Sequence, residues 1–482
     1  MKGEAEIVKE KQDVVVVGAG CAGLCAAIAA CDAGAKTTVM EKAPHLKDTN
    51  TYRAGGFVSF EKGWETRVGF DRELTPEEKT QVALKVNEGH ADPELISILW
   101  ENFNDTMSWL TEHGLVWFGG KGTISHPIGE SHQIRGAGAG LNNQLRQIAE
   151  EKGARVLFNT KARKLLADAK GGVAGVRAMT EEGLKDFESR GVVLATSGFQ
   201  ANQEMMIRYI GADFAHAIRL TGSPYSTGDG HLMAQEMGAK MLSMDQFECR
   251  TIDKTWRPGS PGQVGPFRAL GGFVFSCILV NKLGKRYMDE SYANHSDIAA
   301  SILLQPDSVA SFIFDENIRM IAPDEVARYE RTRPGIIIRA DTIEELAQKI
   351  DVSPEALKKT IEEYNQALKD GKATGLDVPK QGFGLRIETP PFCAVYPVWC
   401  GLNATSGGPK INRLCQVVDR DEAPLPGLYA AGEMVGGILF GKNHTTPEGA
   451  VHRTSTVEYA PWGIGMSLIL GRLAGENAAR LP

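Results

Sequence analysis

Three glycines, Gly18, Gly20 and Gly23, follow a run of four valines and open an alanine-rich segment. This G-x-G-x-x-G spacing suits a dinucleotide. The first glycine permits a tight turn, the second lets a pyrophosphate approach the backbone, and the third lets helix and strand pack closely. Glu41 ends the next apolar run, where a carboxylate accepts both hydroxyls of a ribose and disfavours a 2′-phosphate. The pattern predicts a bound dinucleotide.

The elements that position these residues form a βαβ unit, with a strand over 13–17, a helix over 22–34 and a strand over 36–41. Residues 14–31 carry no charge and are about as long as a membrane span. The glycines inside this stretch favour a strand, a turn and a helix instead. We therefore expect no transmembrane segment.

Start signals for helices and strands follow along the chain. Thr75 and Glu78 form a capping box with a proline at the first helical position, and Asp92 before Pro93 begins a second helix. Strand-like segments separated by glycine or charged turns fill 153–198, and helices are expected over 342–350, 353–369 and 463–479. A Gly-rich stretch, RGAGAG at 135–140, is expected to be a loop.

The pattern of the opening segment returns after Pro390, with a strand running into a turn at 427–433. We therefore predict an α/β fold. A Rossmann-like nucleotide-binding domain, a parallel sheet plus a β-meander, is built from residues 1–203 and 386–482, and an α+β capping domain is inserted at 204–385.

The composition indicates which kinds of partner the protein binds. The chain has 482 residues with 53 basic and 60 acidic side chains, a formal net charge of −7, so no global positive field attracts nucleic acid or an anionic membrane. Its eight cysteines include no CxxC pair and no zinc spacing, which predicts reduced thiols and no metal site. The charged first residues include no apolar signal segment. These features predict a cytoplasmic protein with a small-molecule partner.

Further motifs recur at wide intervals: Asn50-Thr51 with Ala54-Gly55-Gly56, and the segments LATSGF at 194–199, GDG at 228–230, LYAAGE at 428–433 and GRLAGE at 471–476. With them the sequence resembles, from about residue 12 to 480, the flavoprotein family of soluble fumarate reductases and succinate dehydrogenase flavoprotein subunits. Its tricarballylate dehydrogenase-like and 3-ketosteroid dehydrogenase-like branches are the most similar. The resemblance implies that the dinucleotide is FAD and that the inserted domain caps the substrate.

The resemblance also implies which residues hold the flavin. Glu433 and the backbone at Gly463 and Ile464, where the last helix begins, are expected to contact the ribityl chain, the pyrophosphate and the isoalloxazine. Segment 50–56 contains no histidine, so we expect non-covalent FAD, and His45 is interpreted as a solvated residue. The full predicted cofactor site is Gly18, Gly20, Gly23, Glu41, Lys42, Asn50, Thr51, Gly55, Gly56, Ala162, Thr196, Gly198, Asp229, Gly432, Glu433, Gly463 and Ile464.

Members of the family move a hydride between flavin N5 and a carbon next to an electron-withdrawing group, and a side chain handles the other proton. The arginine that serves fumarate reductases is absent from 291–295, where Tyr292 and His295 are the candidates. Ala404 stands where the family has a histidine, and His444 where it has an arginine. These departures favour a neutral or cyclic substrate.

Arg268, in the middle segment, is a fourth catalytic candidate beside Tyr292, His295 and His444. The longer link over 445–462 either reshapes the pocket or forms an outer loop.

Two alternatives to a neutral or cyclic substrate stay open. One is a tricarballylate-like polycarboxylate dehydrogenase or a fumarate reductase-like enzyme. The other, from a different class, is a catalytically inactive flavin subunit that only transfers electrons; a flavin monooxygenase is a further possibility. The sequence contains no second dinucleotide motif, no iron–sulfur cysteine set and no CxxCH, so electrons are expected from an external donor or acceptor. It does not specify the oligomeric state.

Overall fold

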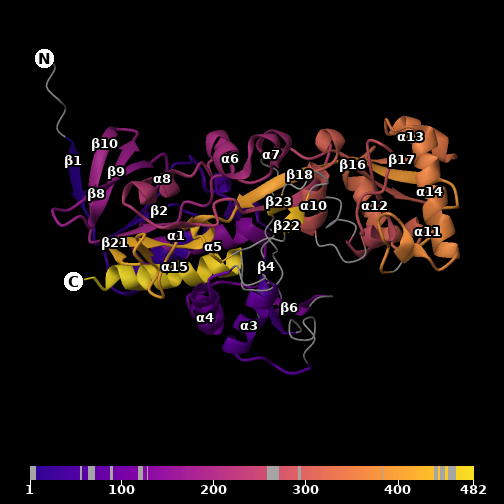
Figure 1. Ribbon diagram of the computed structural model, residues 1–482. Helices are drawn as coiled ribbons and strands as arrows, with labels where there is room; N and C mark the ends of the chain where they lie inside the picture. Colours follow the sequence, from indigo (N-terminus) through magenta and orange to yellow (C-terminus); the bar gives the residue numbers. More distant parts are fainter. Residues whose placement is uncertain are drawn as a thin grey trace, which may run out of the picture.

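The computed structural model describes residues 7–54, 57–62, 71–86, 91–117, 123–126, 129–257, 271–290, 295–382, 384–438, 443–445, 451–453 and 463–481. The molecule is elongated (Figure 1). Strand β1 and the end of helix α15 lie at one end of it, and helices α11 to α14 lie at the other. The segments near both ends of the chain therefore share one half of the molecule.

The larger half is built on a six-stranded sheet of order β20-β21-β11-β2-β3-β7. Its strands are β20 (Gln416–Val418), β21 (Pro424–Ala430), β11 (Gly191–Leu194), β2 (Val14–Val17), β3 (Thr37–Met40) and β7 (Arg155–Leu157). All of them pair in parallel except β20, which is antiparallel to β21. The predicted parallel sheet, assembled from segments near both ends of the chain, is confirmed.

Helices α1 (Cys21–Asp32) and α15 (Ile464–Ala479) pack against this sheet and against each other. Glycines bring the two helices close: a Cβ on Gly471 would lie 2.3 Å from the Ala22 carbonyl oxygen, and one on Gly475 would lie 2.1 Å from that of Ala26. A larger residue at either glycine would push the helices apart. The last helix is thereby held against the helix that follows the glycine turn.

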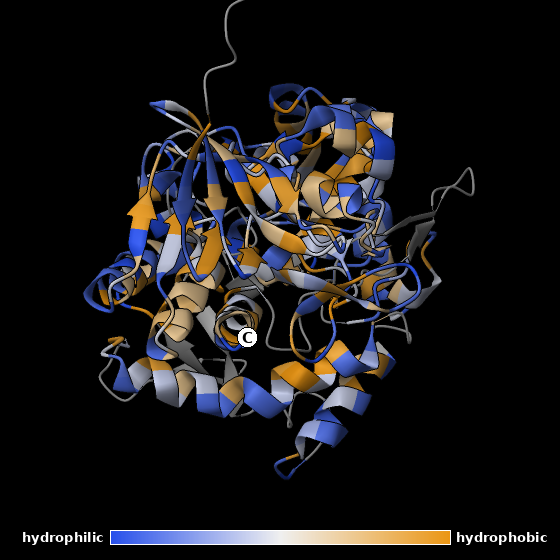
Figure 2. Cartoon of the chain, turned by 90° about the vertical axis from the view of Figure 1, so that its left-hand side faces the viewer, coloured by the Kyte–Doolittle hydropathy of each residue, from blue (hydrophilic) through white to orange (hydrophobic). Residues whose placement is uncertain are grey.

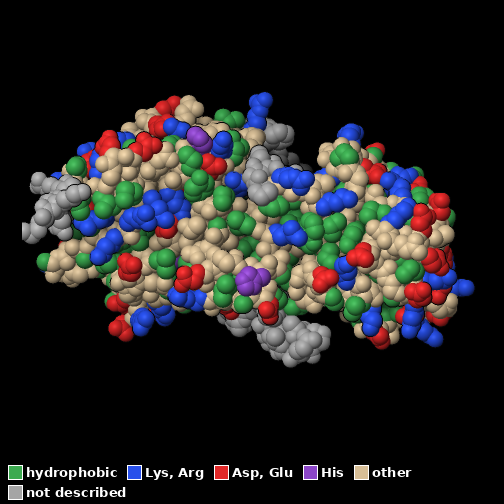
Figure 3. All heavy atoms as spheres, turned by 90° about the horizontal axis from the view of Figure 1, so that it is seen from above, with side chains coloured by type: hydrophobic (Ala, Val, Ile, Leu, Met, Phe, Trp, Pro, Cys, Tyr) green, Lys and Arg blue, Asp and Glu red, His purple; other side chains and the backbone are tan. Residues whose placement is uncertain are grey.

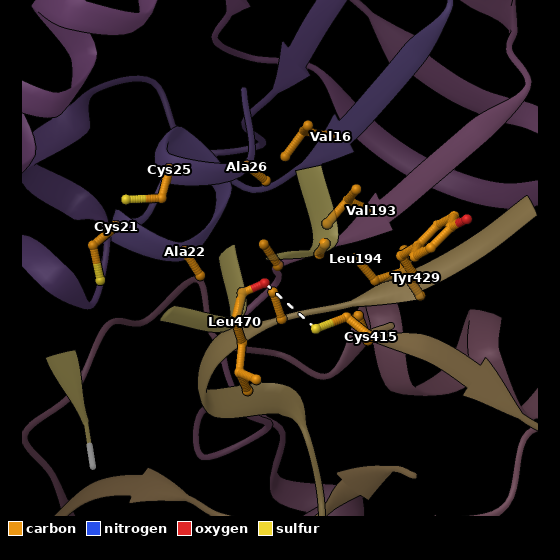
Figure 4. Close-up of a cluster of buried hydrophobic side chains, with 14 of the residues drawn as sticks. Val16, Cys21, Ala22, Cys25, Ala26, Val193, Leu194, Cys415, Tyr429 and Leu470 are labelled. Carbon is orange, nitrogen blue, oxygen red and sulfur yellow. Dashed lines mark hydrogen bonds between the residues drawn. The ribbon is translucent and has the colours of Figure 1, made fainter. Parts of the chain in front are cut away.

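The core between sheet and helices is buried and apolar. Val16 and Val193 of the sheet and Ala22 of α1 belong to one buried cluster, and the Cys415 thiol donates to the carbonyl oxygen of Leu470, at 3.7 Å (Figure 4). Hydrophobic colour is concentrated on the strands, whereas the outer helices are largely hydrophilic (Figure 2). Burial of this kind is the main force that holds the two chain ends together.

A four-stranded meander of order β1-β10-β9-β8 adjoins the sheet. Its strands are β1 (Val8–Lys11), β10 (Gly183–Glu188), β9 (Val173–Thr180) and β8 (Lys161–Ala167). Strand β1 belongs to the charged lead-in, for which the sequence predicted no element, and it pairs in parallel with β10. Its side chains are mostly exposed, which is why no hydrophobic pattern marked it.

The second sheet, of order β12-β18-β16-β15, lies in the other half, and β14 and β17 also pair with β18. Its strands are β12 (Arg219–Leu220), β18 (Phe392–Thr405), β16 (Ala310–Phe314), β15 (Ile278–Asn281), β14 (Phe247–Asp253) and β17 (Ile337–Ala340). Strand β18 has 14 residues and runs from this sheet back to the larger half. Strand β18 pairs with strands of the middle segment and so belongs to their sheet. The predicted boundary at 385/386 instead assigns it to the nucleotide-binding domain. The domain boundaries stay a prediction.

Helices cover both sheets. They are α3 (Pro76–Val86), α4 (Pro93–Glu112), α5 (Ala137–Glu151), α6 (Gln203–Ile210), α7 (Ala212–Ala217), α8 (Asp229–Glu236), α10 (His295–Leu303), α11 (Glu316–Arg319), α12 (Pro323–Thr332), α13 (Ile343–Lys349) and α14 (Pro354–Lys369). The capping box is confirmed: the Thr75 hydroxyl accepts from the Glu78 amide at 3.2 Å, and Glu78 accepts from the Thr75 amide at 2.9 Å. Asp92 caps α4 as predicted.

Short strands complete the fold: β4 (Phe57–Lys62), β5 (Thr123–His126), β6 (Gly129–Gln133), β13 (Met241–Leu242), β19 (Gly408–Pro409), β22 (Asn443–Thr445) and β23 (Val451–Arg453). The RGAGAG segment was expected to be a loop, and this was wrong in part. Residues 137–140 of the segment form the first turn of α5. Gly138 lets this turn pack against the Thr51 carbonyl oxygen, since a Cβ at Gly138 would stand 1.9 Å from that oxygen. In the part of the chain that the structure describes, no helix has the length and apolarity that a membrane crossing needs.

Candidate cofactor site

The glycine turn between β2 and α1 is shaped by close backbone contacts. Gly18 has a φ of +110°, and a Cβ there would lie 2.3 Å from the Ala195 carbonyl oxygen; a Cβ on Gly23 would lie 1.9 Å from that of Gly18. Of the atoms that the structure describes, a Cβ on Gly20 would meet only the Thr51 hydroxyl, at 3.2 Å. Gly18 and Gly23 are therefore required by the fold itself, whereas the absence of a side chain at Gly20 leaves room for a ligand beside the helix N-terminus.

Two side chains brace this turn from a distance. The Thr51 hydroxyl accepts from the Cys21 amide at 2.9 Å, and Asn142 of α5 donates to the Ala19 carbonyl oxygen at 3.2 Å and to the Thr49 hydroxyl at 2.9 Å. Among the described residues, the buried Asn142 Oδ1 atom has no hydrogen-bond partner. It can accept from a ligand hydroxyl. Asn142 was not predicted; the only signal was a polar residue on the buried face of an amphipathic helix.

Glu41 lies at the end of β3, beside the turn. Its Oε2 accepts from the Ala19 amide at 2.9 Å and its Oε1 accepts from the Ala43 amide at 2.8 Å. Burial raises the pKa of Glu41, and the two amide hydrogen bonds oppose that rise. Each oxygen keeps a lone pair for another donor. The geometry suits the predicted role in holding two ribose hydroxyls.

A compact ion network follows at the start of α8. Lys42 donates to Asp229 and to the Thr227 hydroxyl, and Lys161 of β8 lies 3.1 Å from Asp229. Burial alone would raise the pKa of Asp229, but Lys42 and then Lys161 lower it below its ordinary value. Predicted residues Lys42 and Asp229 are thus brought together, with Ala162 next to Lys161 along β8. Lys161 and Thr227 were missed.

Seen from above, Lys and Arg side chains gather over the part of the molecule that contains β8 and α8 (Figure 3). These basic side chains favour an anionic ligand at this end of the site.

Predicted residue Thr196 lies against α8, because a Cβ on Gly230 would stand 2.2 Å from the Thr196 hydroxyl.

Glu433 is the centre of a second polar cluster. Its carboxylate accepts from the Asn50 amide nitrogen at 3.0 and 3.1 Å and from the Ser197 hydroxyl. Asn50 in turn accepts from the Ser223 amide at 3.0 Å. Burial, and then the negative charge of Glu248, raise the pKa of Glu433 to about 7, although Ser197 and Asn50 oppose the rise. Because an acid with a pKa near 7 is half-ionised at neutral pH, a hydrogen-bond donor placed beside it shifts its protonation.

Close contacts at two glycines connect the Glu433 cluster to helix α1 and to strand β18. Gly432 has a φ of +79°, and a Cβ there would lie 2.7 Å from Ala22 Cβ. A Cβ on Gly198 would lie 2.2 Å from the hydroxyl of Thr405, the last residue of β18. The same hydroxyl accepts from the Phe199 amide at 2.8 Å. The second sheet therefore reaches the cluster through β18.

Helix α15 begins at Ile464 after Gly463, which has a φ of +58° and caps the helix without a side chain. Its first turn contains no acidic residue. The first amides of a helix carry partial positive charge and need acceptors. They suit an electron-rich carbonyl or a ring that gains negative charge on reduction.

Several predicted residues lie outside the part that the structure describes. Tyr292, Arg268, Gly55 and Gly56 are among them. His295 begins α10 and His444 belongs to β22, but their side chains are not described. The four catalytic candidates therefore stay predictions. We call the row of contacts that leads from α8 past the glycine turn to Glu433 and α15 the cofactor path. That the predicted residues along it hold the cofactor stays a prediction.

The residues of this path fit FAD. The open face at Gly20 suits a pyrophosphate, Glu41 suits a ribose, the unpartnered Asn142 Oδ1 accepts a hydroxyl, and the start of α15 suits an isoalloxazine carbonyl. When bound, FAD supplies hydride transfer at its N5 atom. Which residues of this chain bind and orient FAD stays a prediction.

Comparison with known proteins identifies the family. The sequence matches the FAD binding domain family over residues 13–445. It is 31% identical to the urocanate reductase of Eggerthella lenta over 489 residues, which cover 97% of this chain and 75% of that protein. The solved structure of the open conformation of a flavocytochrome c3 fumarate reductase aligns with a TM-score of 0.75 at 28% identity, covering 98% of this chain and 78% of that one.

A 3-ketosteroid-Δ4-(5α)-dehydrogenase from Rhodococcus jostii shares the fold, with a TM-score of 0.70 at 24% identity over 99% of this chain and 98% of that one. The chain belongs to the FAD-binding family. The comparisons confirm the predicted cofactor, FAD, and the predicted class, a flavoprotein oxidoreductase of the ene-reductase and dehydrogenase type.

Proposed function

We propose that this chain interconverts a carbon–carbon single and double bond of a small, neutral or cyclic molecule, next to a carbonyl or a conjugated ring. The observation that carries this proposal is the path of β18. Its pairing with β14, β16 and β17 makes it part of the second sheet, and its last residue, Thr405, touches the Glu433 cluster. A substrate bound between the second sheet and the flavin would meet β18 directly.

The residue before Thr405 supports the choice of substrate. Ala404 is buried and apolar where the fumarate reductases resembled by this chain have a histidine. An alanine gives no hydrogen bond to a carboxylate, so a site built here loses one ligand for a dicarboxylate. The urocanate reductase to which this chain is similar reduces urocanate, as its name states, and a reduction agrees with the proposed reaction.

The proposal is tested by anaerobic titration of the dithionite-reduced holoenzyme with a panel of enones, enoates, fumarate and tricarballylate-type acids. Reoxidation of the flavin by a neutral or cyclic acceptor supports the proposal. Reoxidation by polycarboxylates alone identifies the alternative substrate class. If only oxygen or a partner protein reoxidises the flavin, the proposal is wrong and an electron-transfer subunit or a monooxygenase is favoured.

We also propose that the FAD is bound without a covalent link and that the electron donor or acceptor is a separate molecule. Denaturation of the purified yellow protein followed by centrifugation separates the two forms of attachment. Yellow supernatant supports non-covalent FAD, and a yellow pellet contradicts it.

A further inference from the structure

Strand β14 places an acidic residue opposite the alanine described above. It runs antiparallel to β18, and its Glu248 pairs with Ala404. The register shifts between Glu248 and Cys249, since Cys249 pairs with Leu402 and leaves Asn403 as an extra residue on β18. A residue that pairs directly with Ala404 presents its side chain to the same side of the sheet.

The alternation of side chains along β14 indicates which side that is. Phe247 and Cys249 belong to the apolar cluster that also contains Phe199 and Leu402. Successive side chains of a strand point to opposite faces, so Glu248 points away from this cluster. Arg250, half-buried two residues further on, points to the same side as Glu248. This face of β14 therefore presents an acid and a base beside Ala404.

Glu248 is 9% exposed, and its charge acts on Glu433, whose pKa it helps to raise. Glu433 belongs to the predicted flavin site and Ala404 to the strand that reaches it. The two acids, from β14 and from the turn after β21, are therefore close enough for their charges to interact, and Ala404 is the residue next to Thr405, which contacts the Glu433 cluster. The chain carries an acceptor where an alanine has removed the hydrogen-bonding group of β18.

We propose that Glu248 is a specificity-determining residue, which accepts a hydrogen bond from an O–H or N–H group of the substrate and disfavours a second carboxylate. This inference rests on the proposed function and narrows its substrate to conjugated molecules that carry a hydrogen-bond donor. Phenols, anilines and N–H heterocycles share this chemistry. A carboxylate acceptor gives a strong, charge-assisted hydrogen bond to any of them.

Binding without turnover tests the inference. Phenol, aniline and anisole are flat rings that stack on a flavin, and only the first two carry a donor. Each is titrated into the oxidised holoenzyme, and the change in the visible flavin spectrum gives its Kd. We expect the wild type to bind phenol about ten-fold more tightly than anisole. Succinate is titrated in the same way as a probe for a second carboxylate.

Two variants separate the acceptor from its charge. Glu248→Met keeps the side-chain length and removes the acceptor, so the preference for phenol over anisole is expected to disappear and succinate to bind more tightly. Glu248→Gln keeps an acceptor without charge and is expected to retain part of the preference. The matched control, Glu236→Gln on the exposed side of α8, removes one surface charge and is expected to behave as the wild type.

Equal affinity of the wild type for phenol and anisole overturns the inference, and so does an unchanged preference in Glu248→Met. If Glu248→Met does not fold, an unchanged preference in Glu248→Gln together with unchanged succinate binding overturns it. These Kd measurements do not require that the protein catalyse the proposed reaction. A Glu248-dependent preference in a holoenzyme whose reduced flavin no unsaturated acceptor reoxidises supports the binding role and overturns the proposed function.

Discussion

The two ends of the cofactor path differ in how their buried charges are balanced. At the α8 end, Asp229 lies between Lys42 and Lys161, and its pKa is lowered. At the α15 end, burial raises the pKa of Glu433 to about 7 and Glu248 adds negative charge, although the neutral donors Ser197 and Asn50 and the Gly198 backbone oppose the rise. At the first end the carboxylate is matched by cations of the chain itself. At the second end a proton or a ligand donor would further stabilise the acid, which is typical of the part of a site where chemistry takes place.

Both ends depend on the glycine turn between them, so the largest effects are expected there. Gly23→Ala places a methyl group 1.9 Å from the Gly18 carbonyl oxygen, so the backbone of the turn must move. We expect a loss of about 3 kcal/mol or more in the free energy of unfolding, and colourless protein. Urea unfolding and flavin absorbance measure the two effects.

Two other glycines sharpen this test. Gly20→Ala meets only the Thr51 hydroxyl at 3.2 Å, so the fold is expected to persist while the Kd for FAD rises at least ten-fold. Gly375→Ala, with nothing within 4 Å, is the control and is expected to change neither quantity. If Gly20→Ala binds FAD as the wild type does, the pyrophosphate does not lie at this turn.

At the α15 end, the free energy of unfolding is expected to depend on pH with the opposite sign to that of an ordinary ion-paired carboxylate. In cofactor-free protein Glu433 has a pKa of about 7 against an ordinary 4.5, so the native state keeps a proton that the unfolded chain has lost. Stability from this group is therefore fully present below pH 4.5 and is lost as the pH rises to 7. The full difference amounts to about 3 kcal/mol.

Urea unfolding of wild type and Glu433→Gln at pH 5 and pH 8 measures this difference. The wild type is expected to lose more stability than the variant over that interval. Saturation with FAD is expected to reduce the difference, since ligand hydroxyls that donate to Glu433 favour its ionised form. Identical pH dependence in both proteins would show that Glu433 is ionised throughout.

Local spacing explains which parts of this site the sequence could predict. The glycine turn, Glu41 and the Thr75 capping box depend on residues within one or two neighbouring elements, and a single stretch of sequence is enough to define them. The same holds for the strand and turn that end at Glu433. These predictions needed no knowledge of how distant strands pair.

The residues that were missed depend on distant pairing. Lys161 meets Asp229 because β8 lies beside α8, and Asn142 meets Ala19 because α5 packs beside α1. Glu248 faces Ala404 only through a register that shifts by one residue, and a slip of one residue would send its side chain to the opposite face. No local pattern contains that information. Strand β1, short and mostly exposed, was missed because too few of its side chains are buried.

The smallest effects are expected at the balanced α8 end. Lys42→Met removes a cation whose side chain is 19% exposed, and Asp229 keeps Lys161 as a partner. We expect a loss of about 1–2 kcal/mol in stability, together with weaker FAD binding. Lys161→Met removes a cation that is 37% exposed, and less than about 1 kcal/mol is expected because solvent screens it.

A double-mutant cycle over Lys42→Met and Lys161→Met, read by urea unfolding, distinguishes a shared network from two separate contacts. Both lysines act on one carboxylate, so the double variant leaves the half-buried Asp229 without either cation, and its loss is expected to exceed the sum of the single losses. Additive losses would mean that solvent already balances Asp229, and the contrast between the two ends of the path would then arise from Glu433 alone.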